Sequence, residues 1–144
     1  MNLLAGDLGG TKTILAIYSF NRKLIKLHQK SYKSYDWPSF NLILENYLKE
    51  IPKDIAKPTY GCIGIAGPVF EGSAKITNLE WQLNSSQLSQ IANLKQLELI
   101  NDFSSIIYGV SKFDKSQFVE IQGKLSRQIH LNESIAILGA GTGL

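Results

Sequence analysis

Glycine-rich turns follow runs of strand-forming residues at three places in this chain, and this arrangement constrains the fold more than any other feature. The three turns are Gly6 to Thr11, Gly67-Pro68 and Gly139 to Gly143. In α/β folds the loops that follow the strands form the ligand-binding edge of the sheet. The pattern therefore predicts an α/β domain whose ligand site lies at these loops.

The amino-terminal third predicts three strands and then a helix. The strands are expected at Leu3–Gly6, Thr11–Tyr18 and Leu24–Tyr35, with a tight turn at Asp7-Leu8-Gly9-Gly10. β-Branched and aromatic residues favour strands, and short connections favour antiparallel pairing. We therefore expect an antiparallel three-strand meander at one edge of a mixed sheet.

Helices and strands are expected to alternate in the remainder of the chain. A helix that opens at Pro38-Ser39 and stops at Pro52 is followed by a strand at Tyr60–Ala66, which predicts a crossover with parallel pairing. The later expected elements are a turn at Glu71-Gly72-Ser73, a helix from Asn84 to Ala92, a strand at Leu97–Ile100, a helix at Phe103–Val110 and a strand at Ser134–Leu138.

Composition excludes several classes of function. The 144 residues carry a net charge of +3, and only Arg22 and Arg127 are arginines, so nucleic-acid binding is not favoured. Cys62 is the single cysteine, which excludes an internal disulfide framework and fits a reducing compartment. No apolar run approaches the ~18 residues that span a bilayer. We expect one domain with no membrane partner and a cytoplasmic location.

The first glycine-rich turn has two interpretations. It does not match the phosphate loop of the Walker type, because Thr11 separates Gly10 from Lys12 and a strand follows. A hairpin turn can still hold phosphate, since glycine lets backbone N–H groups approach an anion and Asp7 can hold a magnesium-bound water. The other interpretation is a plain hairpin turn, for which Asp and Gly are ordinary residues.

The third glycine-rich turn, Gly139-Ala140-Gly141-Thr142-Gly143, also offers backbone donors to phosphate. It is not a dinucleotide fingerprint, and a simple glycine turn is the alternative. The sequence stops within this turn, so we expect the chain to be part of a longer protein.

Asn101 and Asp102 follow an apolar strand and precede a helix. A carboxylate in this place can accept a proton from a substrate hydroxyl, while the neighbouring amide orients that hydroxyl. Alternatively, Asp102 only caps the helix. Two anion loops and one carboxylate at strand ends together point to a phosphotransferase that acts on an alcohol.

Five segments in this order resemble the bacterial glucokinase family. The segments are Gly6–Thr11, Gly64–Val69, Thr77–Trp81, Ile100–Phe103 and Gly139–Leu144. The resemblance covers the amino-terminal part of that family and implies a ribonuclease H-like (actin-like ATPase) domain over residues 1–144, with a carboxy-terminal domain absent from this chain. Similar loops recur in sugar kinases, actin and heat-shock chaperones.

The resemblance also implies residue roles in the phosphorylation of glucose by ATP. Gly6, Asp7, Leu8, Gly9, Gly10 and Thr11 would form one phosphate loop, and Gly139, Gly141, Thr142 and Gly143 a second one. Asp7 would hold Mg²⁺ through water. Asp102 would be the general base for the 6-hydroxyl, Asn101 would bind a neighbouring hydroxyl, and Gly67 and Asn78 would lie near the sugar. The resemblance also allows a homodimer.

Other functions stay open at this point. The protein could phosphorylate another hexose or an amino sugar, because specificity depends on pocket hydrogen bonds that fall mostly outside this chain. A non-catalytic sugar-sensing relative is the alternative from another class. Such relatives carry a DNA-binding segment before the first turn, whereas Asp7 follows Met1 closely here. We expect the 144-residue chain alone to be inactive.

Overall fold

A computed structural model describes residues 1–76, 78–110, 112–113, 115–119, 121–122 and 136–139. The chain divides into two compact units, Met1–Asp102 and Phe103–Leu144, and each is treated separately below. The first unit contains all of the strands within the described residues.

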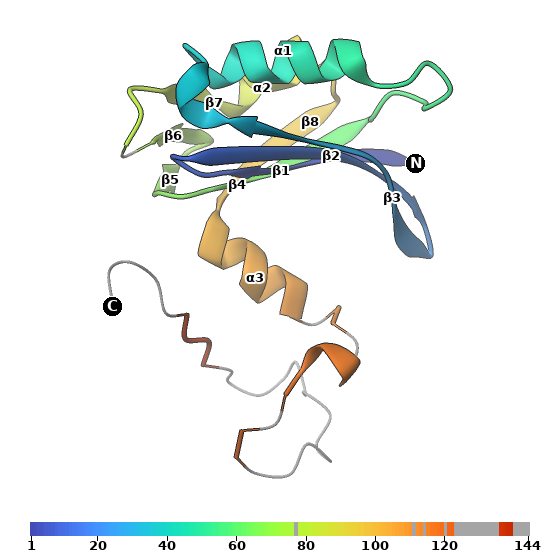
Figure 1. The fold of residues 1–144 in the computed structure, drawn as a ribbon, viewed down its shortest axis with the longest axis vertical. Helices are drawn as coiled ribbons and strands as arrows, with labels where there is room; N and C mark the ends of the chain where they lie inside the picture. Colours follow the sequence, from blue (N-terminus) through green and yellow to red (C-terminus); the bar gives the residue numbers. More distant parts are fainter. Residues whose placement is uncertain (77, 111, 114, 120, 123–135, 140–144) are drawn as a thin grey trace. The chain divides into compact units, whose positions relative to one another are not determined.

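A five-stranded mixed sheet forms the centre of the first unit (Figure 1). Its strands, in sheet order, are β3 (Lys23–Lys33), β2 (Lys12–Asn21), β1 (Asn2–Leu8), β4 (Tyr60–Ile65) and β8 (Gln96–Asn101). Strands β1, β2 and β3 pair antiparallel, whereas β1, β4 and β8 pair parallel. The predicted meander at the edge of the sheet and the predicted parallel pairing are confirmed.

Two helices cover one face of this sheet (Figure 1). Helix α1 (Phe40–Glu50) is capped by Ser39, and helix α2 (Ser85–Ile91) is capped by Asn84, each through a side-chain oxygen that accepts a backbone N–H. Helix starts at these two places were expected, and Ser and Asn are common caps because their side chains satisfy helix amides that have no partner in the helix. The core lies between these helices and the sheet, with Leu8, Ile63 and Tyr47 completely buried.

A smaller three-stranded sheet follows β4 in the chain. It consists of β5 (Val69–Phe70), β6 (Ser73–Lys75) and β7 (Gln82–Asn84). Between β5 and β6, Glu71 and Gly72 both have positive φ angles, of 46° and 70°. Positive φ at both central residues is typical of a two-residue hairpin, so the predicted turn at this place is confirmed.

Several element boundaries differ from the prediction by one to three residues, and two of these differences change the turns beside β1 and β3. Asp7 and Leu8 belong to β1 rather than to the turn, because β1 is paired on both sides and Leu8 still aligns with Thr13 and Ile65. Strand β3 ends at Lys33, two residues before the predicted end at Tyr35. The chain turns there into a short 3₁₀ helix, η1 (Ser34–Asp36), in which the Trp37 N–H donates to the Ser34 carbonyl.

The chain leaves β8 through α3 (Asp102–Val110), and a 3₁₀ helix, η2 (Lys115–Gln117), follows. Of the strand predicted at Ser134–Leu138, Ser134 and Ile135 lie outside the described residues, and residues 136–138 are neither helix nor strand. Among the described residues, no helix has the length and apolar character needed to cross a bilayer.

Candidate functional site

The carboxyl ends of three parallel strands meet at one edge of the main sheet. The register places Leu8, Ile65 and Asn101 in a single row across β1, β4 and β8. Each of these strands therefore passes into its following segment at the same edge. The segments are the loop Gly9 to Thr11, the turn at Gly67 and the start of α3 at Asp102. These three segments were predicted from the sequence to contribute to the ligand site.

Asn101 links two of these segments. Its Nδ2 donates to the Gly67 carbonyl and to Asp102 Oδ1, each over 3.0 Å. A side-chain amide has two N–H protons on this nitrogen, so both hydrogen bonds can form together. The Asp102 carboxylate is thereby held beside the Asn101 amide and at the turn after β4. This is the arrangement that a base and an orienting group need.

The loop between β1 and β2 is short and consists of Gly9, Gly10 and Thr11. The Gly9 N–H donates to the Lys12 carbonyl over 3.0 Å and closes the loop. Within the described part of the chain, the N–H groups of Gly10 and Thr11 have no hydrogen-bond acceptor. A Cβ atom added at Gly10 would lie 3.3 Å from Asn78 Cβ. Asn78, predicted to lie near the sugar, therefore stands against the predicted phosphate loop.

The other residues of the first glycine-rich segment, Gly6 to Leu8, differ in how far they are buried. Leu8 is fully buried in the core, so its side chain is not available to a ligand. Gly6 lies inside β1, where an added Cβ would come within 3.0 Å of Ile63 and Leu15 side-chain atoms. Asp7 is exposed on the same strand. The part of this segment that lies outside the strand pairing is thus Gly9 to Thr11.

Sequence reasoning missed two residues behind this loop, Thr13 and Ser34. Their hydroxyl oxygens lie 2.9 Å apart, and Ser34 Oγ donates to the Gly9 carbonyl over 2.8 Å. Thr13 alternates with Leu15 and Ile17 on the buried face of β2. A polar residue in such an apolar alternation must find a partner inside the protein, and this signal was present in the sequence.

The second predicted phosphate loop falls largely outside the described residues. Gly139 is described and lies in neither a helix nor a strand, whereas Gly141, Thr142 and Gly143 are outside the described set. The arrangement of this loop therefore remains a prediction from sequence.

The residues at the strand edge fit one kind of metal site. Among the described residues, no group of three or more His, Cys, Asp or Glu side chains is placed to hold an ion. Mg²⁺ does not need such a group, because it is commonly held by one or two carboxylates together with water and substrate phosphates. The exposed Asp7 carboxylate beside the loop fits that pattern.

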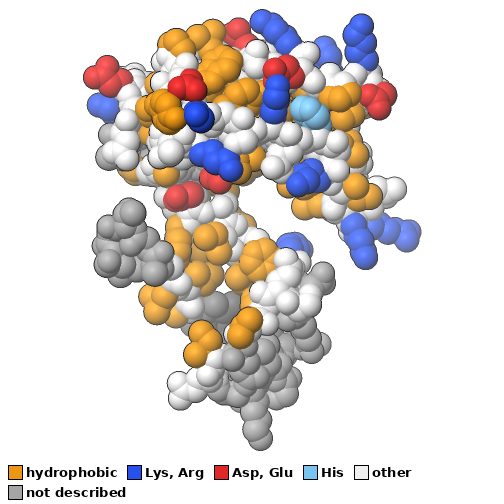
Figure 2. Space-filling model, viewed as in Figure 1, with side chains coloured by type: hydrophobic (Ala, Val, Ile, Leu, Met, Phe, Trp, Pro, Cys, Tyr) orange, Lys and Arg blue, Asp and Glu red, His pale blue; other side chains and the backbone are white. Residues whose placement is uncertain are grey.

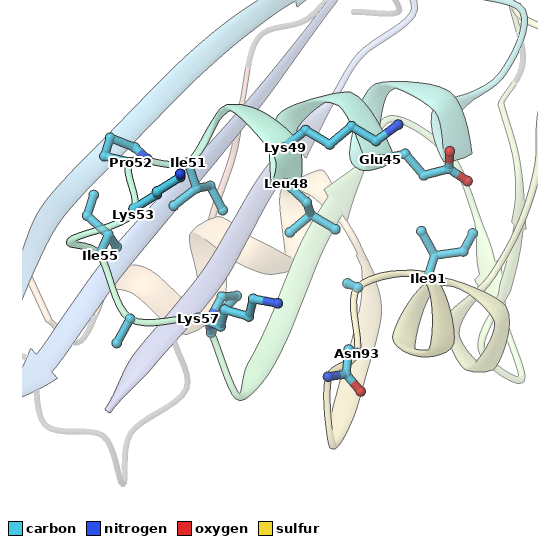
Figure 3. A pocket seen from close by; sticks show the side chains of 13 residues that line it. Glu45, Leu48, Lys49, Ile51, Pro52, Lys53, Ile55, Lys57, Ile91 and Asn93 are labelled. Atoms are coloured by element: carbon cyan, nitrogen blue, oxygen red, sulfur yellow. The ribbon is translucent and has the colours of Figure 1, made fainter.

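A cavity of about 730 Å³ lies elsewhere in the first unit (Figure 3). It opens between the end of α1, the following loop and the end of α2, with Leu48, Ile55 and Ile91 among its apolar lining. None of the predicted site residues lines it.

On the face drawn in Figure 2, acidic and basic side chains of the first unit are interspersed, with no continuous basic surface.

Comparisons of the sequence with known proteins give consistent results. A family model described as Glucokinase matches residues 4–144. The glucokinase of Nostoc punctiforme is 40% identical over 145 residues, and the alignment covers 99% of this chain and 41% of that protein. The glucokinase of a Synechocystis strain is 34% identical over 153 residues, covering 100% of this chain and 42% of that protein. The chain thus spans less than half the length of these relatives.

Solved structures show the same fold. A glucokinase from an Antarctic psychrotroph superposes with a TM-score of 0.77 at 29% identity, over 88% of this chain and 40% of that one. A glucokinase of the ROK family from Streptomyces griseus, solved with glucose and AMPPNP, superposes with a TM-score of 0.59 at 18% identity, over 81% of this chain and 38% of that one. The predicted fold class, an actin-like ATPase domain with a mixed sheet, is confirmed.

Proposed function

Because this chain belongs to the glucokinase family, we propose that the full-length protein transfers the γ-phosphoryl group of ATP to the 6-hydroxyl of glucose. One observation carries the proposal. The hydrogen-bonded Asn101–Asp102 pair and the loop Gly9 to Thr11 follow strands that end at the same edge of the sheet. A base for an alcohol and a phosphate-binding backbone are therefore available on one side of the domain.

In this proposal the loop Gly9 to Thr11 binds the phosphates of ATP. The Gly10 and Thr11 N–H groups, which have no acceptor among the described residues, are suited to an anion, because backbone amides in a turn can bind one. Gly6 keeps β1 close to its neighbours beneath the loop. The second loop, with Gly139, Gly141, Thr142 and Gly143, would add further backbone donors to the phosphates.

The sugar is proposed to bind at Asp102 and Asn101. The Asp102 carboxylate would accept the proton of the 6-hydroxyl as the oxygen attacks the γ-phosphorus, and Asn101 would bind a neighbouring hydroxyl. Phosphoryl transfer has a loose transition state, so position matters more than the strength of the base. Gly67 is joined to Asn101, and Asn78 stands at Gly10, so both would lie between the sugar and the nucleotide.

Magnesium belongs to the same proposal. Bound Mg²⁺ would offset the negative charge of the phosphate oxygens during transfer. Asp7 would accept a hydrogen bond from one of the ion's water molecules, which fits a single exposed carboxylate beside the loop. Asp7 would thus keep the metal and the phosphates at the carboxyl edge of the sheet.

We also propose that residues 1–144 form the amino-terminal domain of a two-domain enzyme. The chain covers 41% of the Nostoc punctiforme relative, so the opposing wall of the sugar site would come from the remaining part of the protein. The two domains would close around the substrates and exclude water, which prevents hydrolysis of ATP. A cytoplasmic location, where ATP is abundant, is part of this proposal.

A test with the full-length protein compares sugars in a coupled assay for ADP. Purified protein, ATP and Mg²⁺ are supplied with glucose, mannose, fructose or glucosamine, and kcat/KM is measured for each. The proposal expects the highest value for glucose. A higher value for another sugar would assign a different sugar kinase activity, and absence of turnover with every sugar would favour the non-catalytic alternative.

A further inference from the structure

Two buried hydroxyl groups lie directly behind the loop Gly9 to Thr11. Thr13 and Ser34 are both fully buried, and among the described residues of the first unit they are the only buried polar side chains apart from the aromatic Tyr32, Tyr47 and Trp81. Buried polar groups are costly unless they form hydrogen bonds. Their location beneath this loop, rather than elsewhere in an apolar core, suggests that the loop requires them.

Ser34 contacts the loop at two points. Its Oγ donates to the Gly9 carbonyl over 2.8 Å, and its N–H donates to the Thr11 carbonyl over 3.0 Å. A serine hydroxyl has one proton, and here that proton goes to Gly9. Over the 2.9 Å between the two hydroxyl oxygens, Thr13 must therefore donate to Ser34. The result is a chain of hydrogen bonds from Thr13 through Ser34 to the Gly9 carbonyl.

Ser34 is itself held in place by the following turn. Its carbonyl accepts the Trp37 N–H over 3.2 Å, which closes η1. The Trp37 ring meets the Tyr32 ring edge-on, with 5.6 Å between their centroids. The loop therefore rests on a packed turn at the end of β3.

These contacts determine where the loop amides point. In a trans peptide the C=O and N–H bonds point in opposite directions. A Gly9 carbonyl directed at Ser34 places the Gly10 N–H on the opposite side of its peptide plane, away from the buried hydroxyls. The Gly10 N–H is one of the two loop amides without an acceptor in the described part of the chain.

We propose that Ser34 and Thr13 are positioning residues for nucleotide binding, because they fix the peptide of Gly9 and Gly10 in the orientation that presents its N–H to a phosphate. The inference rests on the proposed function only for the identity of the anion, ATP. Neither side chain contacts the nucleotide, so both act through the loop backbone. Loss of either hydroxyl should therefore weaken nucleotide binding more than sugar binding.

The test uses the full-length protein and AMPPNP, a non-hydrolysable ATP analogue, as the probe in calorimetry. Ser34→Ala removes the central hydroxyl and should raise the Kd for AMPPNP about 3- to 10-fold, the effect of one lost hydrogen bond. The KM for ATP should rise similarly, while the KM for glucose stays within about 2-fold of wild type. The kcat at saturating ATP should change little.

Thr13 provides a matched pair of variants. Thr13→Val keeps the shape and removes the hydroxyl, so it should weaken AMPPNP binding, whereas Thr13→Ser keeps the hydroxyl and should bind like wild type. Ser89→Ala is the control, because Ser89 also donates to a backbone carbonyl over 2.8 Å, within α2 and away from the loop. A melting curve for each variant shows that it is folded.

The outcomes separate this inference from the proposed function. If wild type binds AMPPNP and both Ser34→Ala and Thr13→Val bind it equally well, the positioning role is wrong. If wild type does not bind AMPPNP, the proposed function fails. Amide hydrogen exchange at Gly9, whose N–H closes the loop, then tests separately whether Ser34 fixes the loop. Faster exchange in Ser34→Ala than in Ser89→Ala supports a loop fixed by Ser34, and equal exchange overturns it.

Discussion

Asp102 is the residue on which the proposed reaction depends most directly. It directly follows β8 as the first residue of α3, and Asn101 Nδ2 donates to its Oδ1. In the full-length protein, Asp102→Asn should lower kcat by about 10²- to 10⁴-fold, because the amide cannot accept the hydroxyl proton. Binding of AMPPNP should remain close to wild type, and calorimetry beside the coupled assay checks both quantities.

Asp54→Asn is the matched control for this substitution, since Asp54 is exposed in the loop after α1 and away from the strand edge. It should leave kcat unchanged. A folded Asp102→Asn protein with near-wild-type kcat would show that Asp102 is not the base and is only the first residue of α3.

Gly10 tests the phosphate loop at the level of one residue. An added Cβ would lie 3.3 Å from Asn78 Cβ, a tight contact, and the two methyl groups of valine would crowd the loop further. Gly10→Val should raise the Kd for AMPPNP at least about 10-fold, because side-chain atoms obstruct the approach of phosphate to the backbone. Unchanged affinity would reduce this segment to a plain hairpin turn.

The control for Gly10→Val is Gly109→Ala in α3, where the nearest atom to an added Cβ is a Phe113 ring carbon at 3.7 Å. That distance is an ordinary contact, so the control should bind AMPPNP like wild type. Its melting temperature should also stay at or above the wild-type value, because Ala has a higher helix propensity than Gly.

At this scale the sequence predicted the polar residues at strand ends but not those beneath them. Asn101 and Asp102 interrupt an apolar run, so their place at the edge of the sheet could be inferred. Ser34 could not be assigned in the same way, because its contact with Gly9 joins residues 25 apart and depends on the register of β2 with β3. Long-range register is set by tertiary packing and not by local pattern.

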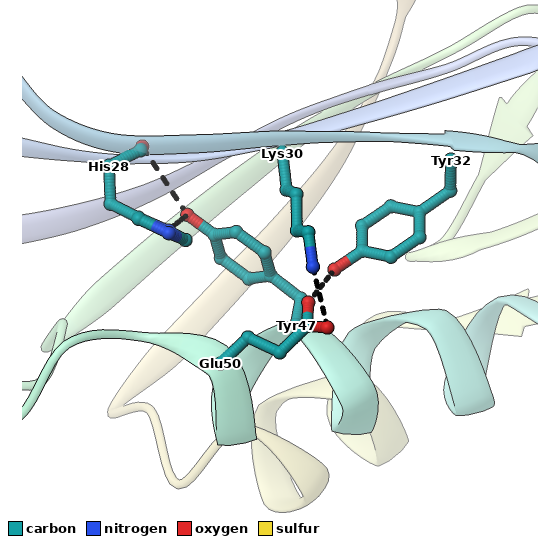
Figure 4. Close-up of polar contacts among 5 residues, drawn as sticks. All are labelled: His28, Lys30, Tyr32, Tyr47 and Glu50. Carbon is teal, nitrogen blue, oxygen red and sulfur yellow. Dashed lines mark hydrogen bonds and ion pairs between the residues drawn. The ribbon is translucent and has the colours of Figure 1, made fainter.

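At the scale of elements, β3 and α1 are joined by polar contacts (Figure 4). Lys30 Nζ lies 2.6 Å from Glu50 Oε1, and the Tyr32 hydroxyl donates to Glu50 Oε2 over 2.8 Å. Nearby, His28 Nδ1 and the Tyr47 hydroxyl lie 3.2 Å apart. Strand residues two apart thus face helix residues three apart, which ties the edge strand to the helix that covers the sheet.

These contacts predict a pH dependence of stability. The hydrogen bond from Lys30, and then the one from Tyr32, lowers the pKa of Glu50 below its ordinary value. A lowered folded-state pKa stabilises the fold above the unfolded-state pKa of about 4.3, and this contribution is lost as the pH falls through the folded-state pKa. Glu50→Gln should therefore lower the free energy of unfolding by less than about 1 kcal/mol at pH 7, since Glu50 is partly exposed.

Urea unfolding of wild type and Glu50→Gln between pH 7 and pH 3 measures this effect. The difference in unfolding free energy between the two proteins should shrink as the pH falls below about 4.3. Glu45→Gln on the exposed side of α1 is the control, because among the described residues Glu45 forms no hydrogen bond or ion pair with another side chain. If the difference in unfolding free energy between wild type and Glu50→Gln persists unchanged at pH 3, the stabilising role of the ionised Glu50 carboxylate is wrong.

Elements were more predictable than their ends. Ser39, Asn84 and Gly72 identify the helix starts and the hairpin because each acts through local chemistry, a cap or a positive φ. The end of β1 at Leu8 was missed, since it depends on neighbours on both sides of the strand. Because the Asp7-Leu8-Gly9-Gly10 segment was interpreted as a turn, the predicted strand ended at Gly6, two residues before the end of β1.

At the scale of the whole molecule, the chain covers 41% of the Nostoc punctiforme glucokinase. In our proposal it therefore supplies only one side of the sugar site. Residues 1–144 alone should not phosphorylate glucose, because no second domain encloses the substrates and excludes water. Their affinity for glucose should be weaker than ~1 mM. A coupled assay with purified chain, ATP, Mg²⁺ and glucose checks the first statement, and calorimetry checks the second.

The Asp102→Asn version of the same 144-residue chain controls for a contaminating kinase from the host. Turnover by the wild-type chain that disappears in this control would contradict the two-domain account. It would mean that the first unit or the remaining residues of this chain complete the site by themselves.

The most direct test of the central claim identifies the atom that receives the phosphoryl group. Full-length protein is supplied with ATP, Mg²⁺ and either glucose or 6-deoxyglucose, and the products are followed by ³¹P NMR with proton coupling. The account predicts glucose 6-phosphate with one ADP per sugar from glucose, and no phosphorylated product from 6-deoxyglucose. Phosphate on another hydroxyl, or a phosphorylated 6-deoxyglucose, would contradict it.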